Sequence, residues 1–199
     1  MVERFRPEHA AQVAALHCSA LPGLLSALGP WTATVFYRGA LTSPRCLAFV
    51  DEHQGAVRGF VFGSSEPEEL RRDILRARPL RILLGSAASV LRKPSVLRLF
   101  ASGVTGGSFD PRAPELTYLA VREEARGAGV GRALLAAFAE DLRARGVARY
   151  ELSVEGDNRA AVDFYQAQGL RETGTYRQFD KLYRRLALEM VPAKGLENR

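Results

Sequence analysis

Glycine is concentrated at one junction of this chain, between an apolar segment and a longer segment with helical periodicity. The apolar segment, residues 116–121, is expected to form a strand, and the helix is expected to begin near residue 131. The junction reads Arg126-Gly127-Ala128-Gly129-Val130-Gly131-Arg132. Glycines let successive backbone N–H groups turn toward one point, and a helix N-terminus adds partial positive charge there. The junction therefore predicts a phosphate or pyrophosphate site and a phosphorylated cofactor.

The glycine-rich junction also has interpretations other than a phosphate site for a cofactor. The glycines could merely shape a strand-to-helix turn, although a single glycine would be enough for that purpose. The dinucleotide-binding fingerprint requires glycines at the first, third and sixth places, and counting from Gly127 the sixth place is Arg132. The nucleotide-triphosphate loop ends in Gly-Lys-Ser or Gly-Lys-Thr, whereas Gly131 is followed by Arg132 and Ala133. Both nucleotide motifs therefore fit less well.

A second motif follows the predicted helix and narrows the interpretation. After a predicted strand at residues 148–154, the chain reads Asn158-Arg159-Ala160-Ala161-Val162-Asp163-Phe164-Tyr165-Gln166-Ala167-Gln168-Gly169-Leu170. Together with the strand end Leu119-Ala120-Val121 and the glycine loop, this segment resembles the GCN5-related N-acetyltransferase (GNAT) superfamily. The resemblance is close over about residues 115–190 and looser before them. It departs from the family at Leu170, where an aromatic residue is common.

The resemblance implies one domain of the α/β (α+β) class with a GNAT fold, in which a single mixed and bent β-sheet is flanked by helices. We expect the domain to span residues 1–192, with a helical insertion at about 66–102 and a tail at 193–199. The apolar pattern adds strands at 2–5, 46–51, 57–63, 171–177 and 183–191, and helices at 7–20 and 31–41. Pro67, with glutamates on both sides, signals the start of a helix in the insertion.

The same resemblance implies acetyl-CoA as the co-substrate. Its pyrophosphate would lie on the backbone N–H groups of residues 126–132, and the side chains of Arg126 and Arg132 would add charge-assisted contacts. Its pantetheine arm would pair with the backbone of Leu119 and Val121, on either side of Ala120, at a splayed strand edge. A backbone N–H near Val121 would stabilise the oxyanion that develops on the carbonyl.

Two residues of the second motif have roles that the resemblance implies. Tyr165 is the candidate general acid that protonates the departing sulfur, and the alternative is that Phe164 and Tyr165 form a packed aromatic pair. Asn158 matches a family residue near the pantetheine arm. The alternative is that it caps the following helix, and both roles are compatible.

Glu115 is the candidate general base. It stands five residues before Ala120, which matches the strand glutamate that acts as the base in histone-acetylating relatives. Strand alternation places it on the same face as Leu119, and the alternative is a plain exposed carboxylate at a strand start. Weaker candidates are Glu155 and Asp110, and many such enzymes use water chains with no single base. The three histidines have no ligand pattern, so no metal site is expected.

Composition limits the classes of protein and partner. The 199 residues are 47% hydrophobic and 25% charged, as in a globular domain with a real core. Residues 71–98 hold eight basic residues and one acidic residue, so the net charge of +6 is local and does not indicate nucleic-acid binding. No apolar run could span a membrane, and the first residues lack the pattern of a secretory signal. Cys18 and Cys46 are most simply buried thiols, so we expect a cytoplasmic protein.

These observations predict an N-acetyltransferase that moves an acetyl group from acetyl-CoA to a primary amine by direct transfer. The acceptor is left open between small molecules and peptides, and a homodimer is left open as well. One alternative is a non-catalytic acyl-CoA-binding or sensing module. Another is an acetyltransferase docked on a membrane or on a protein partner through the basic insertion, although we expect no membrane contact.

Overall fold

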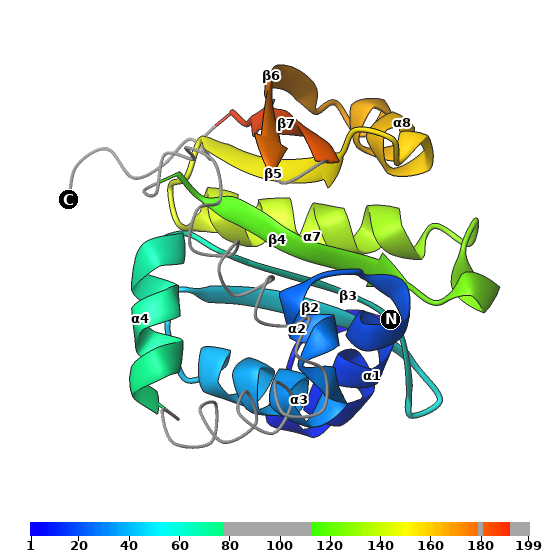
Figure 1. Ribbon diagram of the computed structural model, residues 1–199, viewed down its shortest axis with the longest axis vertical. Helices are drawn as coiled ribbons and strands as arrows, with labels where there is room; N and C mark the ends of the chain where they lie inside the picture. Colours follow the sequence, from blue (N-terminus) through cyan, green and yellow to red (C-terminus); the bar gives the residue numbers. More distant parts are fainter. Residues whose placement is uncertain (78–112, 179–180, 192–199) are drawn as a thin grey trace.

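A single mixed β-sheet organises the chain. The computed structural model describes residues 1–77, 113–178 and 181–191, and within them seven strands have the order β1-β2-β3-β4-β5-β7-β6 (Figure 1). Only β4 and β5 run parallel, and every other neighbouring pair is antiparallel. The strands are β1 (Val2–Arg4), β2 (Cys46–His53), β3 (Ala56–Ser64), β4 (Glu115–Val121), β5 (Arg149–Glu155), β6 (Arg171–Gln178) and β7 (Lys181–Glu189). The mixed sheet expected from the sequence is confirmed.

Helices cover both faces of this sheet (Figure 1). One face carries α1, α3 and α4 on an apolar cluster that includes Val13, Tyr37 and Phe60. The other carries α7 and α8 on a cluster that includes Phe138 and Tyr165. The helices are α1 (Ala10–Ala20), α2 (Leu24–Ala27), α3 (Gly29–Ala40), α4 (Pro67–Ala77), α7 (Val130–Ala144) and α8 (Arg159–Ala167), with 3₁₀ turns η1 (Pro7–His9) and η2 (Glu123–Ala125). The core is thus divided by the sheet.

The helices differ from their expected bounds in a few places. The segment expected to be helical from residue 7 begins as the 3₁₀ turn η1, and α3 begins at Gly29, two residues earlier than expected. The short helix α2 was not expected, because residues 21–23 read only as a helix break. In the insertion, α4 begins at Pro67 as predicted. The remainder of the insertion, 78–102, and the tail at 193–199 lie outside the described residues.

The described part of the basic insertion is partly neutralised. Arg71 forms an ion pair with Glu68 at 3.4 Å, and Arg72 forms one with Glu69 at 2.5 Å. These glutamates precede residues 71–98, the segment that holds the excess of positive charge. Each pair is three residues apart on one helix, and this spacing brings the two side chains together. The excess charge of the first two arginines is therefore balanced locally. Among the helices that the structure describes, none is long and apolar enough to cross a membrane.

Strands β4 and β5 part soon after they begin. Their pairing is confined to Glu115 opposite Glu151, next to which the Glu151 N–H donates to the carbonyl of Pro114 at 2.9 Å. In contrast, β5 and β7 pair at seven successive positions, from Arg149 to Glu155 on β5. The later residues of β4, including Leu119 and Val121, therefore have no strand partner on the β5 side within the described residues. The splayed edge expected from the resemblance is present.

A β-bulge in β4 changes which residues share a face. Phe62 of β3 lies opposite Tyr118, and Gly63 lies opposite Leu116, so Thr117 is an extra residue on β4. Leu116 and Leu119 consequently both pack in the cluster on the α7 face, whereas Tyr118 packs on the α1 face. Glu115 precedes Leu116 and so points to the α1 face. The prediction that Glu115 shares a face with Leu119 is therefore wrong, because it assumed unbroken alternation.

A buried histidine joins α1 to α3 and to β4. His17 is 1% exposed, and its Nδ1 lies 2.7 Å from the hydroxyl of Tyr37. Its ring also stands edge-on to Tyr118, with the centroids 4.6 Å apart. Burial lowers the pKa of His17 from 6.5 to about 4, since the charged imidazolium would lose its hydration here. The neutral ring therefore holds α1 against the strand that carries the bulge.

We predict that the free energy of unfolding decreases as the pH falls from about 6.5 to about 4. In this range the unfolded chain protonates His17 while the folded protein does not, so the unfolded state binds more protons. The shift from 6.5 to about 4 corresponds to a loss of about 3.5 kcal/mol, at about 1.4 kcal/mol per pKa unit. Urea unfolding at several pH values checks this. In His17→Gln the decrease should be clearly smaller, and an unchanged pH dependence would contradict the assignment.

Candidate functional site

The glycine loop adopts a backbone that places it at the N-terminus of α7. Gly127 and Gly129 have φ angles of 77° and 79°, and α7 begins at the next residue, Val130. A Cβ at either glycine would meet no atom within 4 Å, so the surface in front of the loop is open. At Gly131 a Cβ would lie 3.3 Å from Cζ of Phe164. Two glycines are thus required by conformation, and the third lets α8 approach α7 closely.

The backbone N–H groups of this loop are available to a ligand. The N–H of Arg126 donates to the carbonyl of Glu123 at 3.1 Å, so this amide, expected to face a phosphate, already has an acceptor. Within the described residues, the N–H groups of 127–132 have no such acceptor, and the first helix-type bond is from Ala133 to Gly129 at 3.0 Å. Six successive free donors with a helix N-terminus suit an anion such as pyrophosphate.

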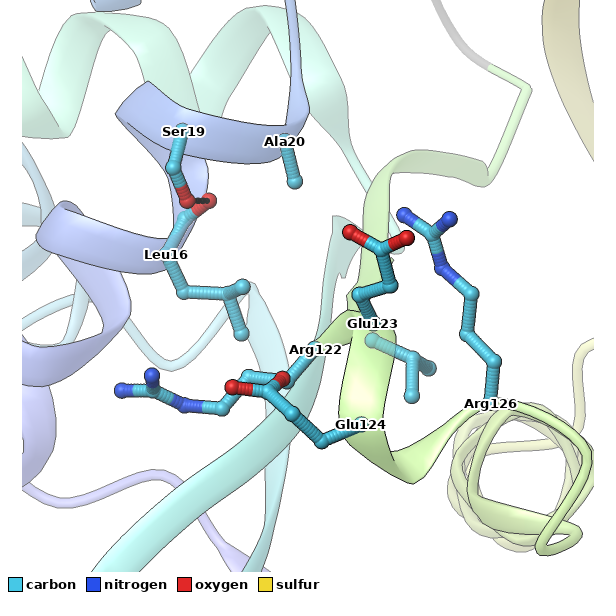
Figure 2. Close-up of a pocket in the computed structure, with 8 residues that line it drawn as sticks. Leu16, Ser19, Ala20, Arg122, Glu123, Glu124 and Arg126 are labelled. Atoms are coloured by element: carbon cyan, nitrogen blue, oxygen red, sulfur yellow. Dashed lines mark hydrogen bonds between the residues drawn. The ribbon is translucent and has the colours of Figure 1, made fainter.

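A pocket of about 480 Å³ lies beside the loop, between the C-terminal part of α1 and the end of β4. Figure 2 shows Glu123 and Arg126 on one side of it, across from Ser19 and Ala20. Arg122 is held in place because its Nε donates to the carbonyl of Val57 at 2.6 Å. The full lining is Leu16, Ser19, Ala20, Val121, Arg122, Glu123, Glu124 and Arg126.

Most of these pocket residues were not found by sequence reasoning, which selected only Val121 and Arg126. The α1 residues come from a helix about 100 residues earlier in the chain, and no local pattern marks them. A usable signal existed for the three residues 122–124, because they stand directly between the predicted strand and the glycine loop. The pocket therefore extends the candidate site from the loop to α1.

Tyr165 lies in α8 on the α7 face of the sheet. It is 8% exposed, and its ring meets Phe164 edge-on with the centroids 5.2 Å apart. The aromatic pair considered as an alternative role is therefore present. Burial raises the pKa of Tyr165, and the nearby phenol of Tyr150 raises it further. Within the described residues its hydroxyl has no hydrogen-bond partner. Tyr165 is thus a protonated phenol without a partner, a state suited to a general acid.

Asn158 occupies the N-cap position of α8. Its side-chain oxygen accepts a hydrogen bond from the N–H of Ala161 at 3.2 Å, so the capping role is confirmed. This bond uses the oxygen alone, and the amide NH₂ group remains able to donate. The residue is exposed at the end of the helix that carries Tyr165. A contact with a bound arm of the co-substrate is therefore compatible with the cap.

Glu115 is half-buried at the start of β4, on the face opposite the one on which Tyr165 packs. Desolvation raises the pKa of its carboxyl, the guanidinium of Arg71 opposes this, and the charge of Glu151 adds to the increase. Six residue steps separate it from Val121 at the loop end, about 20 Å along a strand. Glu115 therefore lies at the far end of the splay from the glycine loop.

The two weaker candidates for the general base are Glu155 and Asp110. Glu155 forms an ion pair with Lys181 at 2.7 Å and accepts a bond from the hydroxyl of Tyr183 at 3.4 Å. Both oxygens of this carboxylate are therefore already in contact with other side chains. Asp110 lies outside the described residues.

One group of the described residues has spacing that would suit a metal ion. Glu3, His9 and Glu52 bring their ligand atoms within 4.8 Å of one another. They lie around β1, at the edge of the sheet and three strands from β4. Nδ1 of His9 accepts the N–H of Arg6 at 3.1 Å, so the proton of a neutral ring is on Nε2, 3.1 Å from Glu52. This arrangement favours an N–H facing carboxylates over a metal ligand, whose second nitrogen normally donates.

Comparisons with known proteins show which proteins this chain is similar to in sequence and fold. A mycothiol acetyltransferase of Beutenbergia cavernae is 40% identical over 70 residues, which are 35% of this chain and 24% of that protein. This chain thus spans about a quarter of the length of that relative. The ribosomal-protein-S18-alanine N-acetyltransferase of Escherichia coli superposes with a TM-score of 0.62 at 18% identity, over 100% of this chain and 99% of that one.

A structure described as an acetyltransferase gives a TM-score of 0.63 at 21% identity, over 96% of this chain and 100% of that one. At such low identities these two structures establish the fold alone. The sequence model of the Acetyltransferase (GNAT) family matches residues 12–170, well over half of the chain and including both motifs and β2 to α8. The chain therefore belongs to the GNAT acetyltransferase family.

Proposed function

We propose that this protein transfers an acetyl group from acetyl-CoA directly to a primary amine of a small-molecule or peptide acceptor. The observation that carries the proposal is the splay between β4 and β5, with six free N–H groups at its open end. An unpaired strand edge can bind an extended amide-containing arm as a further strand would. A glycine-lined helix N-terminus beside it can bind the diphosphate of the same molecule.

Different residues of the site would bind different parts of acetyl-CoA. The free N–H groups of 127–132 would hold the pyrophosphate, with the side chains of Arg126 and Arg132 adding charge. The open space in front of Gly127 and Gly129 supports this, since phosphate can approach the backbone there. Leu119 and Val121 would pair with the pantetheine arm. Asn158 would donate from its free amide group near the same arm.

The chemistry requires one proton to be removed and one to be supplied. The amine nitrogen attacks the thioester carbonyl, the carbon–sulfur bond breaks, and the products are an amide and the free thiol of CoA. Tyr165 would give its proton to the sulfur, and Glu115 would take a proton from the amine, directly or through water. The two side chains belong to opposite faces of the sheet, so the splay would let them serve different atoms of one reaction.

Two other functions would give different experimental results. A non-catalytic acyl-CoA sensor would bind acetyl-CoA but release no thiol. An enzyme docked through its basic insertion would acetylate an amine, and binding of its partner would increase the rate. The test is thiol release from acetyl-CoA with a mixed amine pool, followed by mass spectrometry of the products. The names of the relatives suggest including small amino compounds and peptides with N-terminal alanine. Binding without thiol release in any pool would favour the sensor.

We predict that Gly129→Ala weakens CoA binding by at least about tenfold. The added Cβ would occupy the open space where phosphate must approach, at a φ angle that also disfavours alanine. Gly146→Ala is the matched control, because Gly146 has a φ of 75° and likewise no neighbour within 4 Å. Both variants should lose similar stability, and calorimetry should show weaker CoA binding in the first alone. Equal CoA affinities would remove the loop from the site.

We predict that Tyr165→Phe lowers kcat by about a hundredfold while CoA affinity barely changes. The substitution keeps the ring packed against Phe164 and removes only the hydroxyl. Steady-state kinetics with an accepted amine, together with calorimetry of CoA binding, provides the measurement. An unchanged kcat would mean that Tyr165 serves only in packing.

We predict that Glu115→Gln alters the pH dependence of kcat/KM. The pKa of Glu115 is raised, and only the deprotonated carboxylate can act as a base. The kcat/KM of the wild-type enzyme should therefore increase as the pH rises through this higher pKa. The glutamine variant should lack that inflection and lose about tenfold or more in rate above it. If the two profiles have the same shape and height, the base is another group or a water chain.

A further inference from the structure

The ring of Phe164 lies against Gly131, at the start of α7. A Cβ at Gly131 would be 3.3 Å from Cζ and 3.5 Å from Cε2 of this ring. Cγ2 of Val121, at the end of β4, lies 3.7 Å from the same point. The ring is half-buried and belongs to α8. One side chain therefore stands where the glycine loop, the end of β4 and α8 meet.

The same ring packs against Tyr165, the candidate general acid. The two rings meet edge-on, with their centroids 5.2 Å apart and their planes at 64°. Tyr165 follows Phe164 directly in α8, so a shift of α8 away from α7 would move both side chains together. A phenol can give its proton to a sulfur only from hydrogen-bond distance. The position of α8 on α7 therefore matters for the proposed chemistry.

Packing holds α8 in place. Its hydrogen bonds join residues of the helix to one another or to the turns at its ends, and among the described residues no ion pair joins it to another element. Val162 and Tyr165 pack within the cluster on the α7 face, and Phe164 packs against that cluster. In a closely packed interior, a displacement at one contact is passed to the neighbouring side chains. The contact between Phe164 and Gly131 therefore bears directly on where Tyr165 lies.

From these contacts we infer that Phe164 is a positioning residue for the acetyl transfer, an inference that rests on the proposed function. Its ring, seated on Gly131, holds the phenol of Tyr165 where it can reach the departing sulfur. Gly131 lies within α7 and, unlike Gly127 and Gly129, has no positive φ angle, so its missing Cβ serves this contact and not the shape of the loop. The alternative is that the ring only stabilises the core.

The direct test is a double-mutant cycle of Phe164→Leu and Tyr165→Phe, measured as kcat with an accepted amine. Phe164→Leu keeps an apolar side chain but removes the ring. It should lower kcat about tenfold, because misplacing a reacting group by about 1 Å can cost about a hundredfold. In the Tyr165→Phe background the same change should have little further effect, since no phenol is left to position. The KM for the amine and the calorimetric affinity for CoA should barely change.

A second variant changes the same contact from the side of α7. The helical backbone at Gly131 accepts alanine, but the added Cβ would force the Phe164 ring to shift by a few tenths of an ångström. Gly131→Ala should therefore lower kcat about threefold. Combined with Phe164→Leu it should cause no further loss, because the shorter side chain leaves room. The control Phe49→Leu, at a buried ring of the same cluster on β2, should lower the Tm and leave kcat unchanged.

Other outcomes overturn the positioning role. If Tyr165→Phe is slow but Phe164→Leu keeps the wild-type kcat, the ring has no part in catalysis, and the proposed function is unaffected. If Phe164→Leu lowers kcat equally with and without the phenol, the ring acts only through the stability of the fold. If it weakens CoA binding instead, Phe164 is a contact of the co-substrate. A wild-type kcat in Tyr165→Phe would reject the general acid of the proposed function, and with it the group that Phe164 positions.

Discussion

The architecture depends on how little β4 and β5 pair. Two parallel strands at the centre of a sheet would normally exchange hydrogen bonds along their whole length. Here they meet at one register position and then diverge. On its other side β5 pairs with β7 at every position, and β4 pairs with β3 along its length except at the bulge. The backbone groups left open along β4 must be satisfied by water or by a ligand. An unpaired edge inside the sheet is therefore the structural basis of the binding site that we propose.

The rest of the fold stabilises this open edge from several sides. The bulge at Thr117 turns β4 so that Glu115 and Tyr118 face α1 while Leu119 faces α7. His17, which is hydrogen-bonded to Tyr37, holds α1 against Tyr118 and so fixes the α1 wall of the pocket beside the glycine loop. On the other face, Phe164 packs on Gly131 and brings α8 to the start of α7. The glycine loop, the open edge and Tyr165 are thus held by two separate parts of the core.

Much of this arrangement could be predicted from the sequence, for identifiable reasons. The glycine loop was predictable because positive φ angles at Gly127 and Gly129 leave a compositional trace. The order of strands and helices followed from the two motifs and their separation. The face of Glu115 could not be predicted, because a bulge depends on pairing with β3 and has no local signature here. The pocket residues of α1 also depend on contacts between distant segments.

The central claim, that the open edge of β4 and the adjacent loop bind CoA, is tested most directly by amide NMR during a titration with CoA. The account predicts that the largest shift changes occur at Gly127–Arg132 and at Leu119 and Val121, with smaller changes at Asn158. Residues of β1 and β2, on the far side of the sheet, should not respond. Binding that perturbs other amides and leaves the loop and the end of β4 unchanged would contradict the account.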